Sequence, residues 1–124
     1  KFADVPADSW YAEAVAWANA EGIVSGKSET LFAPNDDITR EQLATILYRY
    51  ATKLCGMSEL TEDNGMLDDF SDMSAVSDFA VAGMEWCVAE GVIGGRGDNT
   101  LAPGGFASRA EVATMLMRFV KAII

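Results

Sequence analysis

Two arginines, Arg40 and Arg109, stand where they could bind an anion. Each directly follows a hydroxyl residue, Thr39 or Ser108, at the start of a predicted helix, and an amide or acid follows two residues later. A hydroxyl with an amide or acid three residues on is typical of a capping box, which satisfies the first backbone N–H groups of a helix. The cap does not explain the arginine, because a cation is disfavoured at the positive end of the helix dipole. We therefore predict that both arginines hold an anion where backbone N–H groups converge.

We further expect the two guanidinium groups to point into a groove lined by the preceding loop, free of internal carboxylate partners. The planar fork of arginine grips a carboxylate through two parallel bonds, which lysine cannot reproduce. The alternative is that each arginine pairs with a nearby acid, such as Asp37, Glu41 or Glu111, in an exposed ion pair worth under about 1 kcal/mol. Two further arginines, Arg49 and Arg118, lie in the C-terminal halves of the same helices and are interpreted as structural.

The overall charge limits the partners that such a site could have. The 124 residues include 9 basic and 19 acidic side chains, for a formal net charge of −10. This field repels nucleic acid and anionic membranes, so neither is an expected partner. No apolar run approaches the length of a membrane span. Any anionic ligand must therefore be held by local arginines.

Residues for catalysis or metal binding are scarce. With no histidine and two cysteines, the usual soft metal sites and histidine-based catalysis are excluded, and no metal or cofactor is predicted. Adjacent acids at 36–37 and 68–69 lie in loop-like acidic segments, which favours solvated loops over a glycosidase pair. We therefore expect no enzyme. Cys55, beside a loop, and Cys87, within a predicted helix, are expected as one partly exposed and one packed thiol, and a disulfide between them stays open.

The elements that position the arginines occur twice. Shifting the sequence by 69 residues aligns it with itself, and a one-residue gap brings Phe2 and Asp4 onto Phe70 and Asp72. The aligned pairs include Trp17 with Trp86, Gly22 with Gly91, Gly26 with Gly95, Pro34 with Pro103, Arg40 with Arg109 and Leu47 with Leu116. We predict repeat one at 1–54, an acidic linker at 55–69 and repeat two at 70–124.

Each repeat is predicted to be a helix, a long loop and a second helix. Asp8 or Ser9 is expected to cap the first helix of repeat one, and glycines 22 and 91 are expected to end the first helices in a left-handed conformation. The loops at 23–37 and 92–106 are long enough to suggest a function. The first helices carry apolar faces that we interpret as core, with each indole packed on a partner helix: Trp10, Ala14, Trp17, Ala18, and Phe79, Gly83, Trp86, Cys87. The second helices are expected to pack together through two stripes: Leu43, Leu47, Tyr50, and Val112, Leu116, Phe119.

These motifs together resemble the S-layer homology family. In repeat one they are Phe-Ala-Asp-Val at 2–5, Trp17, Gly-Ile-Val-Ser-Gly at 22–26, Phe-Ala-Pro at 32–34 and Ile-Thr-Arg-Glu-Gln at 38–42. In repeat two they are Phe-Ser-Asp at 70–72, Trp86, Gly-Val-Ile-Gly-Gly at 91–95, Leu-Ala-Pro at 101–103 and Ser-Arg-Ala-Glu at 108–111. The resemblance implies an all-α fold of tandem helix-loop-helix repeats, part of a pseudo-threefold helical bundle. It also implies an extracellular module that anchors a protein to the bacterial cell wall by binding pyruvylated secondary cell wall polysaccharide.

The resemblance also assigns roles to residues. It makes the two arginines the ligand contacts, the two cap residues their supports, and two loop glycines groove walls where a missing side chain admits a sugar. The implied ligand-binding residues are Arg40, Arg109, Thr39, Ser108, Gly26 and Gly95. Several features depart from the family pattern: Glu41 replaces the usual alanine, Ser108 and Ala107 replace threonine and isoleucine, glycines 104 and 105 replace a polar pair, and two repeats are present where three are common. A third repeat or self-association is therefore a possible partner, and a repeat module that binds other proteins and no glycan is the alternative function.

Overall fold

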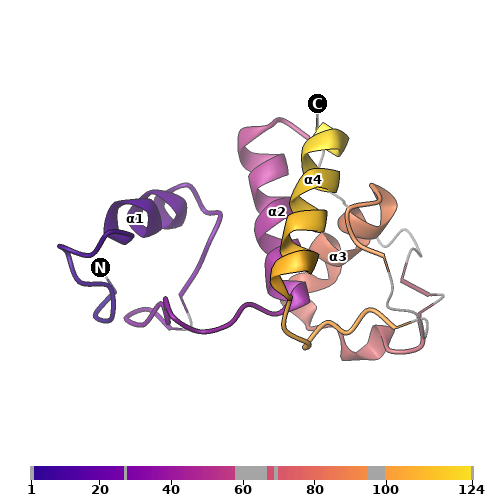
Figure 1. The fold of residues 1–124 in the computed structure, drawn as a ribbon, viewed down its shortest axis with the longest axis horizontal. Helices are drawn as coiled ribbons and strands as arrows, with labels where there is room; N and C mark the ends of the chain where they lie inside the picture. Colours follow the sequence, from indigo (N-terminus) through magenta and orange to yellow (C-terminus); the bar gives the residue numbers. More distant parts are fainter. Residues whose placement is uncertain (1, 27, 58–66, 69, 95–99, 124) are drawn as a thin grey trace. The chain divides into compact units, whose positions relative to one another are not determined.

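A computed structural model describes residues 2–26, 28–57, 67–68, 70–94 and 100–123 of the chain (Figure 1). Within these ranges the regular structure is helical, and Thr39 and Phe106 form an isolated antiparallel bridge. The prediction of an all-α fold is confirmed. The helices are α1 (Ala12–Ala20), α2 (Arg40–Leu54), η1 (Met73–Ala75), η2 (Asp78–Ala80), α3 (Val81–Ala89) and α4 (Arg109–Ile123), the η elements being short 3₁₀ turns.

The chain divides into two compact units, unit one at residues 1–36 and unit two at residues 37–124. Unit one contains α1 and the loop that follows it, and unit two contains the remaining helices. The boundary falls inside repeat one, because α2 packs with helices of repeat two. The compact units therefore do not coincide with the sequence repeats.

In unit one, the Asp4 carboxylate fixes the loop. Its two oxygens accept hydrogen bonds from the backbone N–H groups of Phe32 and Ala33, at 2.8 and 2.6 Å. The Phe32 bond lowers the pKa of Asp4 below its ordinary value of 3.8, partial desolvation opposes that change, and the Ala33 bond adds to it. The Phe2 ring packs on the Phe32 ring with centroids 5.3 Å apart. These contacts hold the loop in place beside the N-terminal segment.

The same arrangement recurs in unit two. The Asp72 carboxylate accepts hydrogen bonds from the backbone N–H groups of Leu101 and Ala102, at 2.8 and 2.9 Å. In both loops an alanine adopts a left-handed conformation, with φ of 60° at Ala33 and 48° at Ala102. This conformation is uncommon for a residue with a side chain. The two repeats therefore match at the level of single hydrogen bonds and backbone angles.

Glycines end both first helices, as the sequence predicts. Gly22 and Gly91 have φ of 77° and 75°, which a side chain would disfavour. Beyond Gly22, the N–H of Ile23 donates to the Ala18 carbonyl at 2.9 Å, the bond that defines a Schellman end, and the equivalent bond closes α3. The start of α1 differs from the prediction. Neither Asp8 nor Ser9 caps it.

The start of α1 follows a turn. The Ser9 hydroxyl donates to the Pro6 carbonyl at 2.7 Å, so it is used three residues before the helix begins. Tyr11 occupies the cap position and makes no side-chain hydrogen bond to the helix. The expected cap is wrong because the local turn competes for the serine hydroxyl.

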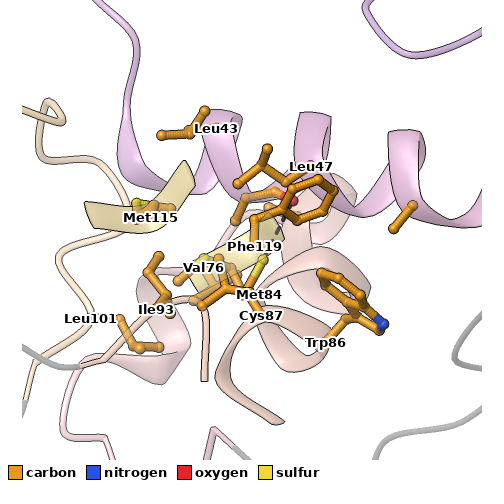
Figure 2. Packing of buried hydrophobic residues seen from close by; sticks show 14 of the residues in the cluster. Leu43, Leu47, Val76, Met84, Trp86, Cys87, Ile93, Leu101, Met115 and Phe119 are labelled. Carbon is orange, nitrogen blue, oxygen red and sulfur yellow. Dashed lines mark hydrogen bonds between the residues drawn. The ribbon is translucent and has the colours of Figure 1, made fainter. Parts of the chain in front are cut away.

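The core of unit two is built where α3 lies on α2 (Figure 2). A Cβ atom added at Gly83 of α3 would lie 3.0 Å from the Thr45 Cα atom of α2, so the two backbones approach closely. Ala44 and Cys87 are fully buried at this contact, and the Cys87 thiol donates to the Ala44 carbonyl at 3.7 Å. Small residues on both helices therefore set the spacing of the core.

Helix α4 covers the other side of this core through Phe119 and Met115, which are 4 % and 3 % exposed. The Phe119 ring contacts the rings of Tyr50 and Trp86, with centroids 6.0 and 5.9 Å apart. The predicted pairing of the second helices is thus confirmed at Tyr50 and Phe119. It is wrong in two respects: α3 is the main partner of α2, and Leu116 of the predicted stripe is 45 % exposed.

The tryptophans divide between core and surface. Trp86 is 3 % exposed and packs in the core, as predicted, whereas Trp17 is 52 % and Trp10 is 93 % exposed. The core prediction for the two indoles of repeat one is therefore wrong. Trp10 lies in the turn before α1 begins, and among the described residues of unit one α1 is the only helix, so no second helix of this unit covers Trp17.

Both cysteines are free, Cys55 exposed and Cys87 buried, which confirms the expectation of one accessible and one packed thiol. Burial raises the pKa of the Cys87 thiol to about 12. Of the predicted linker, residues 58–66 and 69 lie outside the described residues. Leu67, within the same stretch, is buried in the core of unit two rather than solvated.

Candidate functional site

The Arg40 side chain lies inside unit two and makes three hydrogen bonds there, one from each guanidinium nitrogen. Its Nε donates to the Leu101 carbonyl at 2.7 Å, and one terminal nitrogen donates to the Gly94 carbonyl at 2.9 Å. The other terminal nitrogen pairs with the Glu111 carboxylate at 2.5 Å. The Arg40 side chain is 5 % exposed, compared with 27 % for Glu111. The prediction that Arg40 has no internal carboxylate partner is wrong.

The ion-pair alternative is only partly right, because the Arg40–Glu111 pair is not an exposed one. A first-turn arginine of repeat one binds two carbonyl groups and an acid of repeat two. Partly buried charged hydrogen bonds of this kind are stronger than surface ion pairs, and removing one partner leaves the others unsatisfied. Arg40 therefore joins the two repeats.

Backbone groups at the start of α2 are also occupied. The N–H groups of Arg40 and Glu41 donate to the carbonyls of Gly105 and Pro103, at 2.9 and 3.1 Å. The capping box is present as predicted, with the Gln42 N–H donating to the Thr39 hydroxyl and the Thr39 N–H donating to the Gln42 side chain. An anion cannot use these N–H groups without displacing the loop of repeat two. The predicted N–H contribution to anion binding is therefore wrong at α2.

Glu111 connects this cluster to the start of α4. One Glu111 carboxylate oxygen accepts from the Ser108 N–H at 3.0 Å, and the Glu111 N–H donates to the Ser108 hydroxyl at 3.1 Å. The predicted capping box of repeat two is thus present. The other carboxylate oxygen pairs with Arg40. A single acid therefore caps α4 and holds the arginine of α2.

A pocket of about 270 Å³ opens beside this pair. Its apolar floor comes from Ile93 and Met115, both buried, and one wall is the exposed Gly94. Arg118 reaches the pocket from α4 and is exposed to solvent. The full lining is Arg40, Ile93, Gly94, Ala110, Glu111, Thr114, Met115 and Arg118.

Arg118 lines the pocket, although its position in the sequence indicated only a structural role. Glu111, Thr114 and Arg118 are spaced at i, i+3 and i+7 and so share one face of α4, which is the signal that could have found it. Within the part of the chain that the structure describes, no ion pair engages the Arg118 guanidinium. Unlike Arg40, it can offer its donors to a ligand.

The remaining predicted residues lie in different settings. A Cβ atom at Gly26 would lie 2.5 Å from both the Phe2 ring and the Leu31 carbonyl, so the space meant for a sugar is filled by the chain itself. Gly95 and the side chain of Arg109 lie outside the described residues. At Gly94, beside Gly95, an added Cβ atom would meet no atom within 4 Å. The open wall in repeat two is therefore Gly94.

The pocket combines two guanidinium groups, one carboxylate and an apolar floor. The Thr114 hydroxyl donates to the Ala110 carbonyl at 2.9 Å and keeps lone pairs for accepting a bond. Such a surface can hold a small group that carries both a carboxylate and a methyl, with hydroxyls at the rim. Among the described residues, no group of three or more His, Cys, Asp or Glu side chains could hold a metal ion.

Comparison with known proteins identifies the family. The S-layer homology domain matches residues 1–44 and 69–113, which is most of the chain. The chain therefore belongs to the S-layer homology family, as its motifs indicated. The two matched segments contain both capping boxes and both arginines.

Related proteins include a surface-layer protein, an exoglucanase and a cellulosome-anchoring protein. The chain is 37 % identical over 123 residues to the surface-layer 125 kDa protein of Lysinibacillus sphaericus, covering 97 % of this chain and 10 % of that protein. It is 34 % identical over 116 residues to the exoglucanase XynX of Acetivibrio thermocellus, covering 94 % and 10 %. The cellulosome-anchoring protein of the same species is 28 % identical over 117 residues, covering 94 % and 25 %.

The chain thus spans a tenth to a quarter of the length of these relatives. The family and these relatives indicate a cell-surface anchoring module located at the cell surface or wall. Among the described residues, no helix is both long and apolar enough to cross a membrane.

Proposed function

We propose that the chain is a non-catalytic module that anchors its parent protein by binding acidic, pyruvylated cell wall polysaccharide at the pocket beside Arg40. The observation that carries this proposal is the juxtaposition of Arg118 with the buried floor of Ile93 and Met115. A pyruvyl ketal presents a carboxylate and a methyl group on one carbon. The guanidinium binds the carboxylate, and the floor covers the methyl.

In this proposal each site residue has a separate role in binding. Arg118 makes the direct charge contact, and Arg40 adds a second positive charge while remaining bound to Glu111. Thr39 and Ser108 hold the two helix starts through their capping boxes. Gly94 leaves room for a sugar ring above the floor.

The remaining predicted residues keep a proposed part in ligand binding. Arg109 and Gly95 are proposed as contacts at the corresponding positions of repeat two. Gly26 is proposed to act indirectly, because its missing side chain lets Phe2 and the Leu31 carbonyl close the loop of unit one. No catalytic step is proposed for any of these residues.

Binding to purified wall polysaccharide tests the proposal. The chain should bind the pyruvylated polymer and lose about tenfold or more of its affinity when the pyruvyl groups are removed, because a charged hydrogen bond is then lost. Salt should weaken the binding, since the contact is electrostatic. Equal affinity for both polymers would reject the proposal.

The alternative is a repeat module that binds other proteins and no glycan. One observation favours it: hydrogen bonds within unit two already occupy Arg40, the arginine that the family motif offers as a ligand contact. Failure to bind either polymer, together with retained folding, would support this alternative.

A further inference from the structure

The packing of α3 on α2 joins two repeats and serves as a template. Helix α2 is the second helix of repeat one, and α3 is the first helix of repeat two. Ala44, Leu47 and Ala51 of α2 are 0 %, 6 % and 0 % exposed and belong to the core that the two helices share. A second helix of one repeat therefore accepts the first helix of the next.

The same accepting surface exists on α4 and lies open. Shifting α2 by 69 residues places Ala113, Leu116, Met117 and Val120 of α4 at the positions of Ala44, Leu47, Tyr48 and Ala51. We name these four residues the α4 face. Leu116, Met117 and Val120 are 45 %, 51 % and 48 % exposed. Three large apolar side chains at helical spacing on one exposed face indicate a docking surface.

The matching first helix is α1. Ala14 aligns with Gly83, Trp17 with Trp86, and Val15 with Met84. Trp17 is 52 % exposed, whereas its counterpart in α3 is 3 % exposed. In sequence, α1 and the α4 face are thus complementary in the way that α3 and α2 are.

We propose that the α4 face of one copy binds α1 of a second copy, as α2 binds α3 within unit two. The occupant is a second copy because each copy presents both halves of an interface whose geometry the chain already contains. This inference concerns surfaces outside the pocket and does not rest on glycan binding. The contact is heterologous, so association runs head to tail and ends only if a ring closes.

Two differences make this contact weaker than its template. Ala14 carries a methyl group where Gly83 has none. In the contact of α3 with α2, a Cβ atom at Gly83 would lie only 3.0 Å from the Thr45 Cα atom, so the extra methyl is crowded. Glu41 of α2 accepts bonds from the Ser77 N–H and hydroxyl at 2.9 and 2.7 Å, and its counterpart on α4 is Ala110, which has no carboxylate. The association should therefore be reversible and dependent on concentration.

Sedimentation velocity over a wide range of protein concentration, without polysaccharide, tests the proposal. The parent chain should grow in mass as concentration rises. Leu116→Glu on the α4 face and Trp17→Glu on α1 should each weaken association about tenfold or more. Ala75→Glu, at an exposed residue of η1, is the control and should associate like the parent.

Mixing the two variants gives the sharper result. The Trp17→Glu chain keeps its α4 face and the Leu116→Glu chain keeps its α1, so an equimolar mixture should form a one-to-one complex that grows no further. A far-UV circular dichroism spectrum equal to that of the parent shows that each variant is folded.

Three outcomes would overturn the inference. The first is a parent chain that stays monomeric at every concentration, including one whose α4 amides are protected from hydrogen exchange because α1 of the same chain covers them. The second is unchanged association in both variants. The third is a mixture of the two variants that stays monomeric.

Discussion

Two helix starts with the same motif have different surroundings. At the start of α2, Arg40 and Glu41 are 4 % and 8 % exposed and lie under the loop of repeat two. At the start of α4, Ser108 and Ala110 are exposed, although the same capping box is formed. The motif fixes the local helix start, and the neighbouring repeat decides whether that start is buried. A motif arginine can therefore hold two repeats together where it is covered.

The largest expected effect comes from removing Arg40. Arg40→Ala leaves the Leu101 and Gly94 carbonyls and the Glu111 carboxylate without their donor, and should lower the free energy of unfolding by about 3 kcal/mol or more. Urea denaturation measures this loss. Lys121→Ala, an exposed change of equal charge on α4, should cost under about 0.5 kcal/mol.

Arg40→Lys sharpens the same comparison. A lysine keeps the charge but cannot reach three partners with a planar fork, so it should recover only part of the lost stability. Full recovery would mean that charge alone matters at this position. If Arg40→Ala lowers the free energy of unfolding no more than Lys121→Ala does, Arg40 does not hold the two repeats together.

A smaller effect is expected at Glu41, whose counterpart in repeat two is Ala110. Glu41→Ala strands the N–H and hydroxyl of Ser77 and should cost about 1–3 kcal/mol in thermal or urea unfolding. Glu41→Gln retains one acceptor oxygen and should cost less. If Glu41→Ala leaves the free energy of unfolding unchanged, the Glu41 carboxylate does not stabilise the packing of η2 on α2.

The smallest effect concerns acid and unit one. Because the pKa of Asp4 is lowered in the folded chain, its contribution to stability is present above the ordinary value of 3.8 and is lost as pH falls through the folded pKa. Asp4→Asn should therefore lower the stability of the fold at neutral pH, where the ionised carboxylate contributes, and flatten the pH dependence of unfolding as the pH falls below that value. An NMR titration that gives Asp4 an ordinary or raised pKa would contradict the hydrogen bonds that its carboxylate accepts from Phe32 and Ala33.

The sequence alone predicted features that depend on residues close along the chain. Both capping boxes and the left-handed glycines at 22 and 91 follow from local types and spacing. The partners of Arg40 could not be predicted in the same way, because they lie 54 to 71 residues further on. They follow from how repeat two folds over α2.

Exposure of the aromatic residues shows the same limit. Trp17 and Trp86 occupy equivalent positions in equivalent helices, yet one is half exposed and the other is buried. No pattern within either helix distinguishes them, because the difference comes from which helix lies against each one. Arg118 was missed for a related reason: its helical face was visible in the sequence, but the pocket in front of it required the loop that carries Gly94.

The central claim is that the pocket holds a pyruvyl carboxylate through Arg118, and a cycle of four affinities tests it most directly. The parent chain and Arg118→Ala are each titrated with the pyruvylated polymer and with the polymer after pyruvyl removal, and Lys121→Ala serves as the charge-matched control. The account predicts that either change alone weakens binding about tenfold, and that both together weaken it little further, because they remove the same contact. Independent, additive losses, or an Arg118→Ala chain that binds like the parent, would contradict it.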